Sequence, residues 1–489
     1  MRSVKFLILS LVVLVASTAC NKDISASLAL ERTSLYFASW DAELQYISYV
    51  PTNAVSVGVA SYSNGWNASV DIATETIAIW PEGTTEEGMT NDDLPKEGSV
   101  VINALNAEGE ATSYYISLYI TQTLPLDTAG IANSYIVTAP ATSYTFDAMH
   151  RPDGSELATA DVKLLWQSNP NAVRNVDLVD GKASFYVTSS YEDDAKVADT
   201  NAVIAAYNAS NEVIWSWHLW ITNDNPLAAT DTYSNGKVFM QRNLGAFANA
   251  NGSTEEQKIL DSYGMYYQWG RKDPFPRPYH FDASGAEDES RYDMDGVYIK
   301  ENFPERSSSN GTLDYVTKNP MHYITNAACV AEGGDGIGDW LVTAGKTLWN
   351  DEKKSVYDPC PYGWRVPTAE DLSVLKLSDA EDNTPLETAR KQYGWNLSDG
   401  NNSFFYSACG RRRYNDGKVE NMNSKDGVYP SQPQPWEGYY WTSTTTVDGK
   451  AVVEYYDKKK MSRKSAFYKK RAHRMIQKRR MNLWKKRKN

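Results

Sequence analysis

Short alternating segments separated by turn residues most constrain the fold of this chain. The clearest is Ser113-Tyr-Tyr-Ile-Ser-Leu-Tyr-Ile-Thr-Gln122. Side chains point alternately to the two faces of a strand, so such runs predict strands with one buried face. Turn formers such as Asn64-Gly65 and Pro81–Thr84 separate them. This spacing predicts an antiparallel β-sandwich over residues 24–123. The other predicted strands are Ser34–Ala38, Ala54–Ser61, Ser69–Ile72, Thr76–Trp80 and Ser99–Leu105.

Several short motifs in this first region occur in a characteristic order. They are Thr33-Ser-Leu-Tyr-Phe37, Gly65-Trp66, Ile79-Trp80-Pro81, Ile102-Asn-Ala-Leu-Asn106 and Ile120-Thr-Gln122. Their order resembles a BACON domain, an immunoglobulin-like module common near the N-terminus of Bacteroidetes surface proteins. We expect Trp66 and Trp80 to belong to the core rather than to a ligand platform.

Residues 126–228 predict a second β-rich domain. Its last strand, Ile214-Trp-Ser-Trp-His-Leu-Trp-Ile221, contains His218 between two tryptophans. A lone histidine in a strand is more often a hydrogen-bonded structural residue than a metal ligand or a base, and we expect that role here. The runs NSYIV, LLWQ, NAVIAA and WSWHLW together resemble the segment that often precedes the Fibrobacter succinogenes major paralogous (FISUMP) domain.

Residues 229–457 contain four blocks in the order found in the FISUMP domain itself. The blocks are Met240–Ala246, Tyr263–Pro274, Asp358–Thr368 and Gly438–Ser443. The resemblance implies a C-terminal α+β domain related to the C-type-lectin-like and formylglycine-generating-enzyme fold, with small twisted sheets and two helices. The whole chain is therefore expected to be multidomain and mostly β.

Two local patterns in this third region predict structure. Gly264 and Gly270 bracket the aromatic run 265–269, which we expect to form a buried helix turn or strand. Thr368 and Asp371 approximate a capping box, so a helix is expected from Thr368 to Leu377.

The end of the third region departs from the family pattern. FISUMP domains usually close with a strand containing Val-Arg-Cys, whose cysteine is expected to pair with the cysteine of the Asp-Pro-Cys-Pro block. The corresponding stretch, Ala466–Gln477, supplies no cysteine. Cys360 therefore lacks its expected partner, and pairing with Cys329 or Cys409 is left open. The cysteine spacing matches no zinc signature.

The charge of the chain is divided unequally. Residues 458–489 contain 16 Lys or Arg and no Asp or Glu, and the remaining residues carry 33 basic against 61 acidic groups. The acidic body argues against nucleic-acid binding. For the basic tail, a solvated charge run is favoured over a nucleic-acid site, and we expect it to be disordered or loosely helical beyond about residue 470.

No recognised motif points to catalysis. The sequence has no Gly-x-Ser-x-Gly elbow, no phosphate-binding loop and no HExxH pair. We therefore expect no enzyme activity, no catalytic residue, no metal site and no cofactor.

Two functions remain after this exclusion. The first is a cell-surface recognition or adhesion lipoprotein that binds a glycan or a host-surface ligand. The second is an accessory or tip subunit of a pilus-like assembly with pilin partners. Consecutive arginines are almost never all buried, so the arginine run of the third region is the most surface-like candidate for ligand contact. The candidate residues are Tyr406, Arg411, Arg412, Arg413 and Tyr414.

The N-terminus predicts an export signal over residues 1–19. Arg2 and Lys5 precede the mostly apolar Phe6–Ala16, which is too short to span about 30 Å of hydrocarbon. Small residues then lead to Cys20, an ending that resembles a bacterial lipoprotein signal, although Ser17 stands where Leu is usual. The resemblance implies a lipidated Cys20 and attachment to the outer membrane, with exposure at the cell surface. The alternative is an ordinary secreted protein cut near Ala19.

Lipidation can be tested by metabolic labelling with a radioactive fatty acid. The wild-type chain should incorporate label, and Cys20→Ser should not, because the lipid is attached through the cysteine sulfur. Equal labelling of the two proteins would exclude the anchor.

Overall fold

The computed structural model describes residues 25–277, 290–330, 339–343, 347–350, 353–377, 394–422, 437–446, 451–457, 461–465, 474–475 and 478–479. The export signal and Cys20 lie outside these ranges. The chain divides into two compact units. The first comprises Met1–Pro125, Ala141–Thr145 and Ser184–Tyr186, and the second comprises Leu126–Pro140, Phe146–Ala183 and Val187–Asn489. The predicted boundary at residue 228 stays a prediction.

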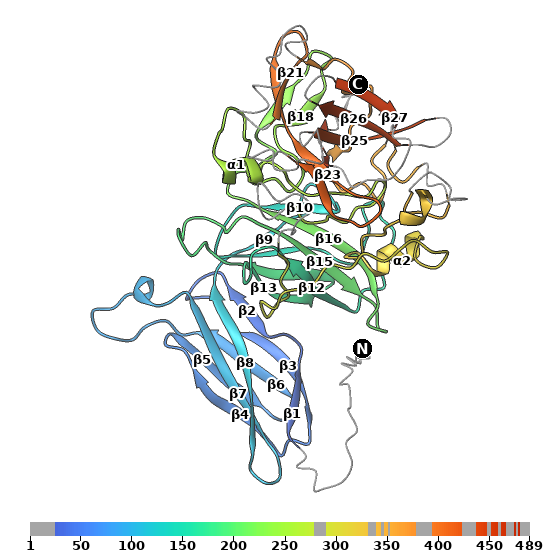
Figure 1. Cartoon of the computed structure of the whole chain (residues 1–489). Coiled ribbons are helices and arrows are strands. Elements are labelled where there is room, and N and C mark those ends of the chain that lie inside the picture. Colours follow the sequence, from blue (N-terminus) through green and yellow to red (C-terminus); the bar gives the residue numbers. More distant parts are fainter. Residues whose placement is uncertain are drawn as a thin grey trace, which may run out of the picture. The chain divides into compact units, whose positions relative to one another are not determined.

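The first unit contains two four-stranded sheets with the orders β1-β3-β6-β5 and β2-β8-β7-β4, drawn in blue and cyan in Figure 1. Pairing is antiparallel except between β2 and β8, which are parallel. The predicted strands are present within a few residues, and β1 and β3 are additional. The strands are β1 Ser27–Leu30, β2 Ser34–Phe37, β3 Gln45–Thr52, β4 Ser56–Tyr62, β5 Trp66–Asp71, β6 Thr76–Pro81, β7 Glu97–Leu105 and β8 Ala111–Ile120.

Alternating burial explains why these segments form a sandwich. In β3, Ile47 and Tyr49 are buried, whereas Tyr46 and Val50 are exposed. Trp66 is buried against Phe37 and Trp40, with ring centroids 5.3 and 5.1 Å away. Trp66 is therefore a core residue as expected, whereas Trp80 is only half-buried.

The second unit begins with β-structure whose central strands are buried on both faces. One sheet has the order β10-β16-β15-β12. A further sheet has the order β13-β14-β11-β9, and of its strands β9, residues 142–145 of β11 and residues 184–186 of β14 are counted with the first unit. In β16, both the Trp215–Trp217 face and the Ser216–His218 face are buried. The strands are β9 Thr123–Pro125, β10 Ser134–Val137, β11 Thr142–Asp147, β12 Asp161–Gln167, β13 Val173–Val179, β14 Lys182–Val187, β15 Thr200–Tyr207 and β16 Val213–Ile221.

The rest of the second unit combines short strands with long stretches of irregular chain. Its sheets have the orders β17-β18-β29-β19, β20-β21-β22 and β24-β23-β25-β26-β27. Within the described ranges, every helix is too short or too polar to span a bilayer. The elements are β17 Thr230–Thr232, β18 Val238–Met240, α1 Glu256–Asp261, α2 Leu313–Lys318, β19 Trp364–Arg365, β20 Lys376–Leu377, β21 Gly394–Ser398, β22 Ser403–Ser407, β23 Cys409–Arg412, β24 Val419–Met422, β25 Glu437–Thr445, β26 Ala451–Asp457, β27 Met461–Ser465, β28 Arg474–Met475 and β29 Lys478–Arg479.

The fold is mostly β, as the sequence predicts. The described helices of the C-terminal region are one to two turns long. The more specific α+β, C-type-lectin-like assignment stays a prediction.

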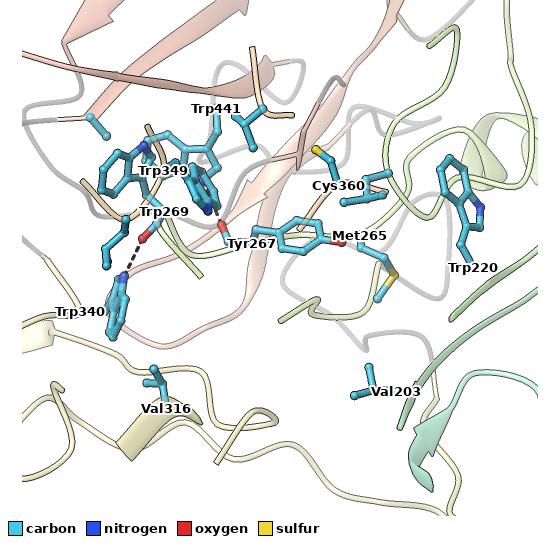
Figure 2. Close-up of a cluster of buried hydrophobic side chains, with 14 of the residues drawn as sticks. Val203, Trp220, Met265, Tyr267, Trp269, Val316, Trp340, Trp349, Cys360 and Trp441 are labelled. Carbon is cyan, nitrogen blue, oxygen red and sulfur yellow. Dashed lines mark hydrogen bonds between the residues drawn. The ribbon is translucent and has the colours of Figure 1, made fainter. Parts of the chain in front are cut away.

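Buried tryptophans organise the irregular chain of the second unit. Trp269, Trp340 and Trp441 are almost completely buried, and Figure 2 shows their rings gathered in one cluster. The indole of Trp441 donates to the Tyr267 carbonyl at 3.0 Å, and that of Trp340 donates to the Trp269 carbonyl at 2.9 Å. The rings thus fill the core, and the indoles of Trp441 and Trp340 also satisfy backbone acceptors.

Two glycines let the aromatic run 265–269 enter this core. Gly264 has φ +63°, and a Cβ there would lie 2.5 Å from the Leu244 carbonyl oxygen. Gly270 has φ +84°, and its Cβ would lie 2.7 Å from Leu348. Only glycine fits both the backbone conformation and the space. The run is buried, as expected; Tyr266 forms a bridge with Phe275, and the run ends in a turn at Trp269 and Gly270.

The predicted helix from Thr368 to Leu377 is wrong. Both capping-box bonds form, because the Asp371 N–H donates to Thr368 Oγ1 at 3.0 Å and the Thr368 N–H donates to Asp371 Oδ2 at 2.9 Å. Asp371 Oδ2 also accepts from Arg365 at 3.2 Å. The following N–H groups bond three residues back, as Leu375 does to Leu372, and the chain then pairs as β20 with β21. The box therefore closes a turn instead of starting a helix.

The predicted disorder of the tail is wrong at four residues. β28 pairs with β25 through Met475 and Trp441, and β29 lies between β18 and β19. Pairing uses backbone groups, so a run of basic side chains does not prevent strands only two residues long. The other residues beyond 465 lie outside the described ranges.

Cys360 is a fully buried free thiol. The pairing with Cys329 or Cys409 that the sequence left open is therefore not formed. Burial raises the pKa of the Cys360 thiol well above its usual range.

His218 has the structural role expected from the sequence. Its Nε2 lies 2.8 Å from Asn201 Oδ1, and its Nδ1 lies 3.0 Å from Ser134 Oγ. The Asn201 amide nitrogen donates to the Gly245 carbonyl at 3.0 Å, which leaves the amide oxygen to accept from His218. The network therefore holds the ring neutral, and burial lowers its pKa to about 3.

This pKa predicts a specific loss of stability in acid. Below pH 6.5 His218 of the unfolded chain takes up a proton, whereas His218 of the folded protein does so only near pH 3. The free energy of unfolding therefore decreases as the pH is lowered from 6.5 towards 3. His218 should therefore contribute a loss of about 2 kcal/mol in unfolding free energy between pH 7 and pH 5. Denaturant titrations followed by tryptophan fluorescence should show that His218→Gln lacks this component. Parallel pH profiles for the two proteins would contradict the assignment.

Candidate ligand-binding cleft

The second unit contains an open cleft of about 1030 Å³. Its volume lies at the upper end of the roughly 300–1000 Å³ typical of ligand sites. Hydroxyl, amide and charged side chains dominate its lining, with two tyrosines. The lining residues are Ser168, Asn169, Pro170, Asn171, Ala172, Arg174, Thr188, Ser189, Ser190, Tyr191, Glu192, Asp193, Lys196, Val197, Ala198, Asp199, Asn223, Phe247, Gln257, Leu260, Asp261, Arg277, Ser290 and Tyr292.

The loop between β14 and β15 forms one wall of the cleft. Ser189 and Val197 pair as an isolated bridge, and the Ser190 N–H donates to the Lys196 carbonyl at 2.7 Å. Asp193 closes the turn by accepting from the Ala195 N–H at 3.0 Å. Tyr191 stands at the tip of this closed loop, with a relative exposure of 102%. An aromatic ring this open to solvent is available to a ligand.

Asp199 lies at the base of the same loop and is half-buried. Its Oδ1 accepts hydrogen bonds from the backbone and amide nitrogens of Asn223, both at 3.2 Å. Burial raises the pKa of the Asp199 carboxyl, and the negative charge of Asp261 raises it further, whereas the Asn223 hydrogen bond opposes the shift. The carboxyl therefore lies in a place where further negative charge is disfavoured.

Helix α1 and the chain near residue 277 form the opposite wall. Asp261 accepts from Arg277 Nη1 at 2.8 Å and from Gln257 at 2.9 Å. The Arg277 guanidinium also lies 5.2 Å from the centre of the Phe247 ring, a cation–π contact. A partly buried ion pair therefore links the two segments of this wall.

The arrangement is suited to hydrogen bonding and ring stacking. In the described part of the chain, no three His, Cys, Asp or Glu side chains converge as a metal-ligand set. The cleft presents amides and hydroxyls, which both donate and accept hydrogen bonds, beside Tyr191 and the half-buried Tyr292.

The sequence-predicted candidates lie elsewhere, and the exposure predicted for two of them is wrong. Tyr406 is buried, and its hydroxyl lies 2.6 Å from that of Tyr233. Arg412 is completely buried. Arg411, Arg413 and Tyr414 are half-buried. Arg411 lies over the Tyr439 ring at 4.7 Å, and Arg413 is paired with Asp416. None of the five residues lines the cleft.

Arg412 can be buried because its donors reach acceptors. It donates to the carbonyls of Gly417 at 2.7 Å and Pro276 at 2.9 Å, and to Glu301 at 3.2 Å. The guanidinium also lies about 6 Å from the ring centres of Tyr266, Phe303 and Tyr323. Alternation along β23 turns this side chain inward between its two neighbours. At least Arg412 of the arginine run thus stabilises the core and is not available to a ligand.

Sequence reasoning missed the cleft because its residues come from distant segments without a shared motif. The one local signal is Ser189-Ser-Tyr-Glu-Asp-Asp-Ala-Lys196, a polar, turn-rich stretch with a single aromatic residue. An isolated tyrosine in such a loop has no sheet face to pack against. That pattern indicates exposure, although it does not indicate a ligand.

Comparisons with known proteins do not assign the chain to a family. No family model and no curated protein matches it. Among solved structures, the Bacteroides ovatus mixed-linkage glucan utilization locus protein SGBP-B, in complex with a mixed-linkage heptasaccharide, is 9% identical, with coverage of 39% of this chain and 43% of that chain and a TM-score of 0.12. Protocadherin gammaB7 EC3-6 is 11% identical, with coverage of 41% and 52% and a TM-score of 0.15. This chain thus spans about half or less of either structure, and likeness this low carries no argument about function.

The two neighbouring arginines give a matched test of the buried network. Arg412→Ala should lower the unfolding free energy by about 3–5 kcal/mol, because it leaves buried acceptors and Glu301 without this guanidinium. Arg413→Ala, at a half-exposed ion pair, should cost about 1 kcal/mol or less. Chemical denaturation of both variants measures the difference. Equal costs would show that Arg412 is not part of a buried network.

Proposed function

We propose that this chain is a non-catalytic, surface-displayed recognition protein that binds a glycan in the cleft of its second unit. The observation that carries the proposal is the combination of a cleft of about 1030 Å³, a polar lining and the fully exposed Tyr191 at its rim. Catalysis would need a nucleophile or an acid–base pair held ready for reaction. Here Asp261 is tied to Arg277 and Gln257 instead.

The chemistry of sugars fits these side chains. The C–H faces of sugar rings pack on aromatic rings, which Tyr191 offers at the tip of its loop and Tyr292 offers within the cleft. Sugar hydroxyls act as donors and as acceptors, and the amides of Asn169 and Asn171 can satisfy both roles. A few convergent polar groups of this kind are what fix the orientation of a ligand.

The proposal includes display at the cell surface. The basic and apolar residues before Cys20 support a lipid anchor in the outer membrane. The motifs of residues 24–123 and 229–457 support a BACON-like module followed by a FISUMP-like domain. In this arrangement the sandwich of the first unit follows the anchor in the sequence and precedes most of the binding unit.

Tyr191→Ala tests the binding site. The purified full-length protein is screened on a glycan array that includes mucin glycans, and the affinity for the best ligand is measured by calorimetry. Loss of the ring should weaken binding about 10-fold, since one aromatic contact is worth roughly 1 kcal/mol or somewhat more. Tyr298→Ala is the matched control, because Tyr298 is 59% exposed in the same unit but does not line the cleft.

The expected result is weaker binding for Tyr191→Ala and unchanged binding for Tyr298→Ala, with no turnover of any ligand. Equal effects of the two variants would argue against the cleft. If the protein binds no glycan and co-purifies with pilins, the pilus function is correct instead.

A further inference from the structure

We infer that the cleft selects neutral, hydroxyl-rich oligosaccharides and discriminates against anionic ones such as uronic-acid, sulfated or sialylated glycans. The inference rests on the proposed function, and it names the class of ligand for the same site.

The first argument is the formal charge of the lining. Its cations are Arg174, Lys196 and Arg277, and its acids are Glu192, Asp193, Asp199 and Asp261. The lining therefore carries a net charge of −1. An anionic ligand would enter a field of its own sign, whereas a neutral ligand would experience no such repulsion.

The second argument is that two of the three cations are already committed. Arg277 Nη1 lies 2.8 Å from Asp261 Oδ1, with side-chain exposures of 8% and 21%. Lys196 Nζ lies 2.9 Å from Asp193 Oδ2 across the turn of the Tyr191 loop. A ligand carboxylate or sulfate would have to share either cation with its present partner, and the ligand charge would then lie close to the carboxylate of Asp193 or Asp261.

The third argument concerns Asp199. This carboxyl is half-buried, and the charge of Asp261 already disfavours its ionised form. A ligand anion nearby would add to the same repulsion. The carboxyl oxygens can instead accept hydrogen bonds from ligand hydroxyls, which carry no charge.

The size of the cleft indicates an oligosaccharide. At about 1030 Å³ it exceeds what a single sugar ring fills, and Tyr191 and Tyr292 both contribute to its lining. Its uncharged lining groups, including Asn169, Asn171 and Ser190, outnumber the charged ones. A chain of neutral sugars would find a hydrogen-bonding partner along the whole cleft.

Arg174 provides the decisive variant. It is half-buried at the start of β13, and among the described residues its guanidinium forms no ion pair. If the natural ligand were anionic, Arg174 would be the cation free to hold it. Arg174→Gln should therefore abolish the binding of any anionic ligand.

The experiment uses the full-length protein on an array of neutral glycans and their carboxylated or sulfated counterparts. The bound set should consist of neutral oligosaccharides, with affinities that change less than about twofold between 20 and 500 mM NaCl. Binding mainly to anionic glycans, with affinity lost at high salt and in Arg174→Gln, would overturn the inference. Binding of no glycan, or binding unaffected by Tyr191→Ala, would overturn the proposed site itself, which is a different result.

A charge-reversal variant tests the mechanism of selection. Glu192→Lys changes an exposed residue of the lining and brings its net charge to +1. Affinity for acidic counterparts of the best neutral ligand should rise by at least about fivefold, because the repulsion becomes attraction. Glu108→Lys makes the same change at an exposed position of the first unit and should have no effect. Equal gains in both variants would mean that the overall charge, and not the cleft, sets the preference.

Discussion

Hydrogen bonds from buried tryptophan indoles to backbone carbonyls hold the second unit together. Much of the described part of that unit is irregular chain. The indoles of Trp269, Trp340 and Trp441 donate to the carbonyls of Thr442, Trp269 and Tyr267 at 2.9, 2.9 and 3.0 Å. A buried acceptor without a partner costs about 1–3 kcal/mol, so these contacts are what makes a loop-rich core possible. The walls of the cleft are built on that core.

Buried cations also donate hydrogen bonds to backbone carbonyls. Their charges are part of the core and are not exposed to a ligand. Arg412 is surrounded by carbonyls, aromatic rings and Glu301, and Lys272 donates to the Ser216 carbonyl at 3.0 Å and to Asp273 at 2.6 Å. Both charges are thus paired within the fold. Contact with a ligand therefore requires exposed side chains. Tyr191 is the most exposed aromatic residue among those described.

Short sequence motifs predicted the local structure correctly where that structure depends on one segment alone. They failed where contacts with a distant segment determine it. The buried aromatic run between Gly264 and Gly270 could be foreseen, because positive φ and lack of space demand glycine at both ends. The capping box at Thr368 and Asp371 also formed, but no helix follows it. Asp371 instead binds Arg365, and the chain then pairs with strand β21. A motif of four residues does not indicate which distant segments will contact it.

The sequence by itself determined the mostly β class and the sandwich of the first unit, because strand periodicity is local. It also indicated that His218 would be a hydrogen-bonded core residue. Only the tertiary structure decided which charged side chains are paired in the interior and which line the cleft. Arg412 and Arg413 are adjacent in the sequence, yet one is buried and the other half-exposed. The cleft likewise joins residues 168–199 with residues 247–292, and proximity between such distant segments arises only when the chain folds.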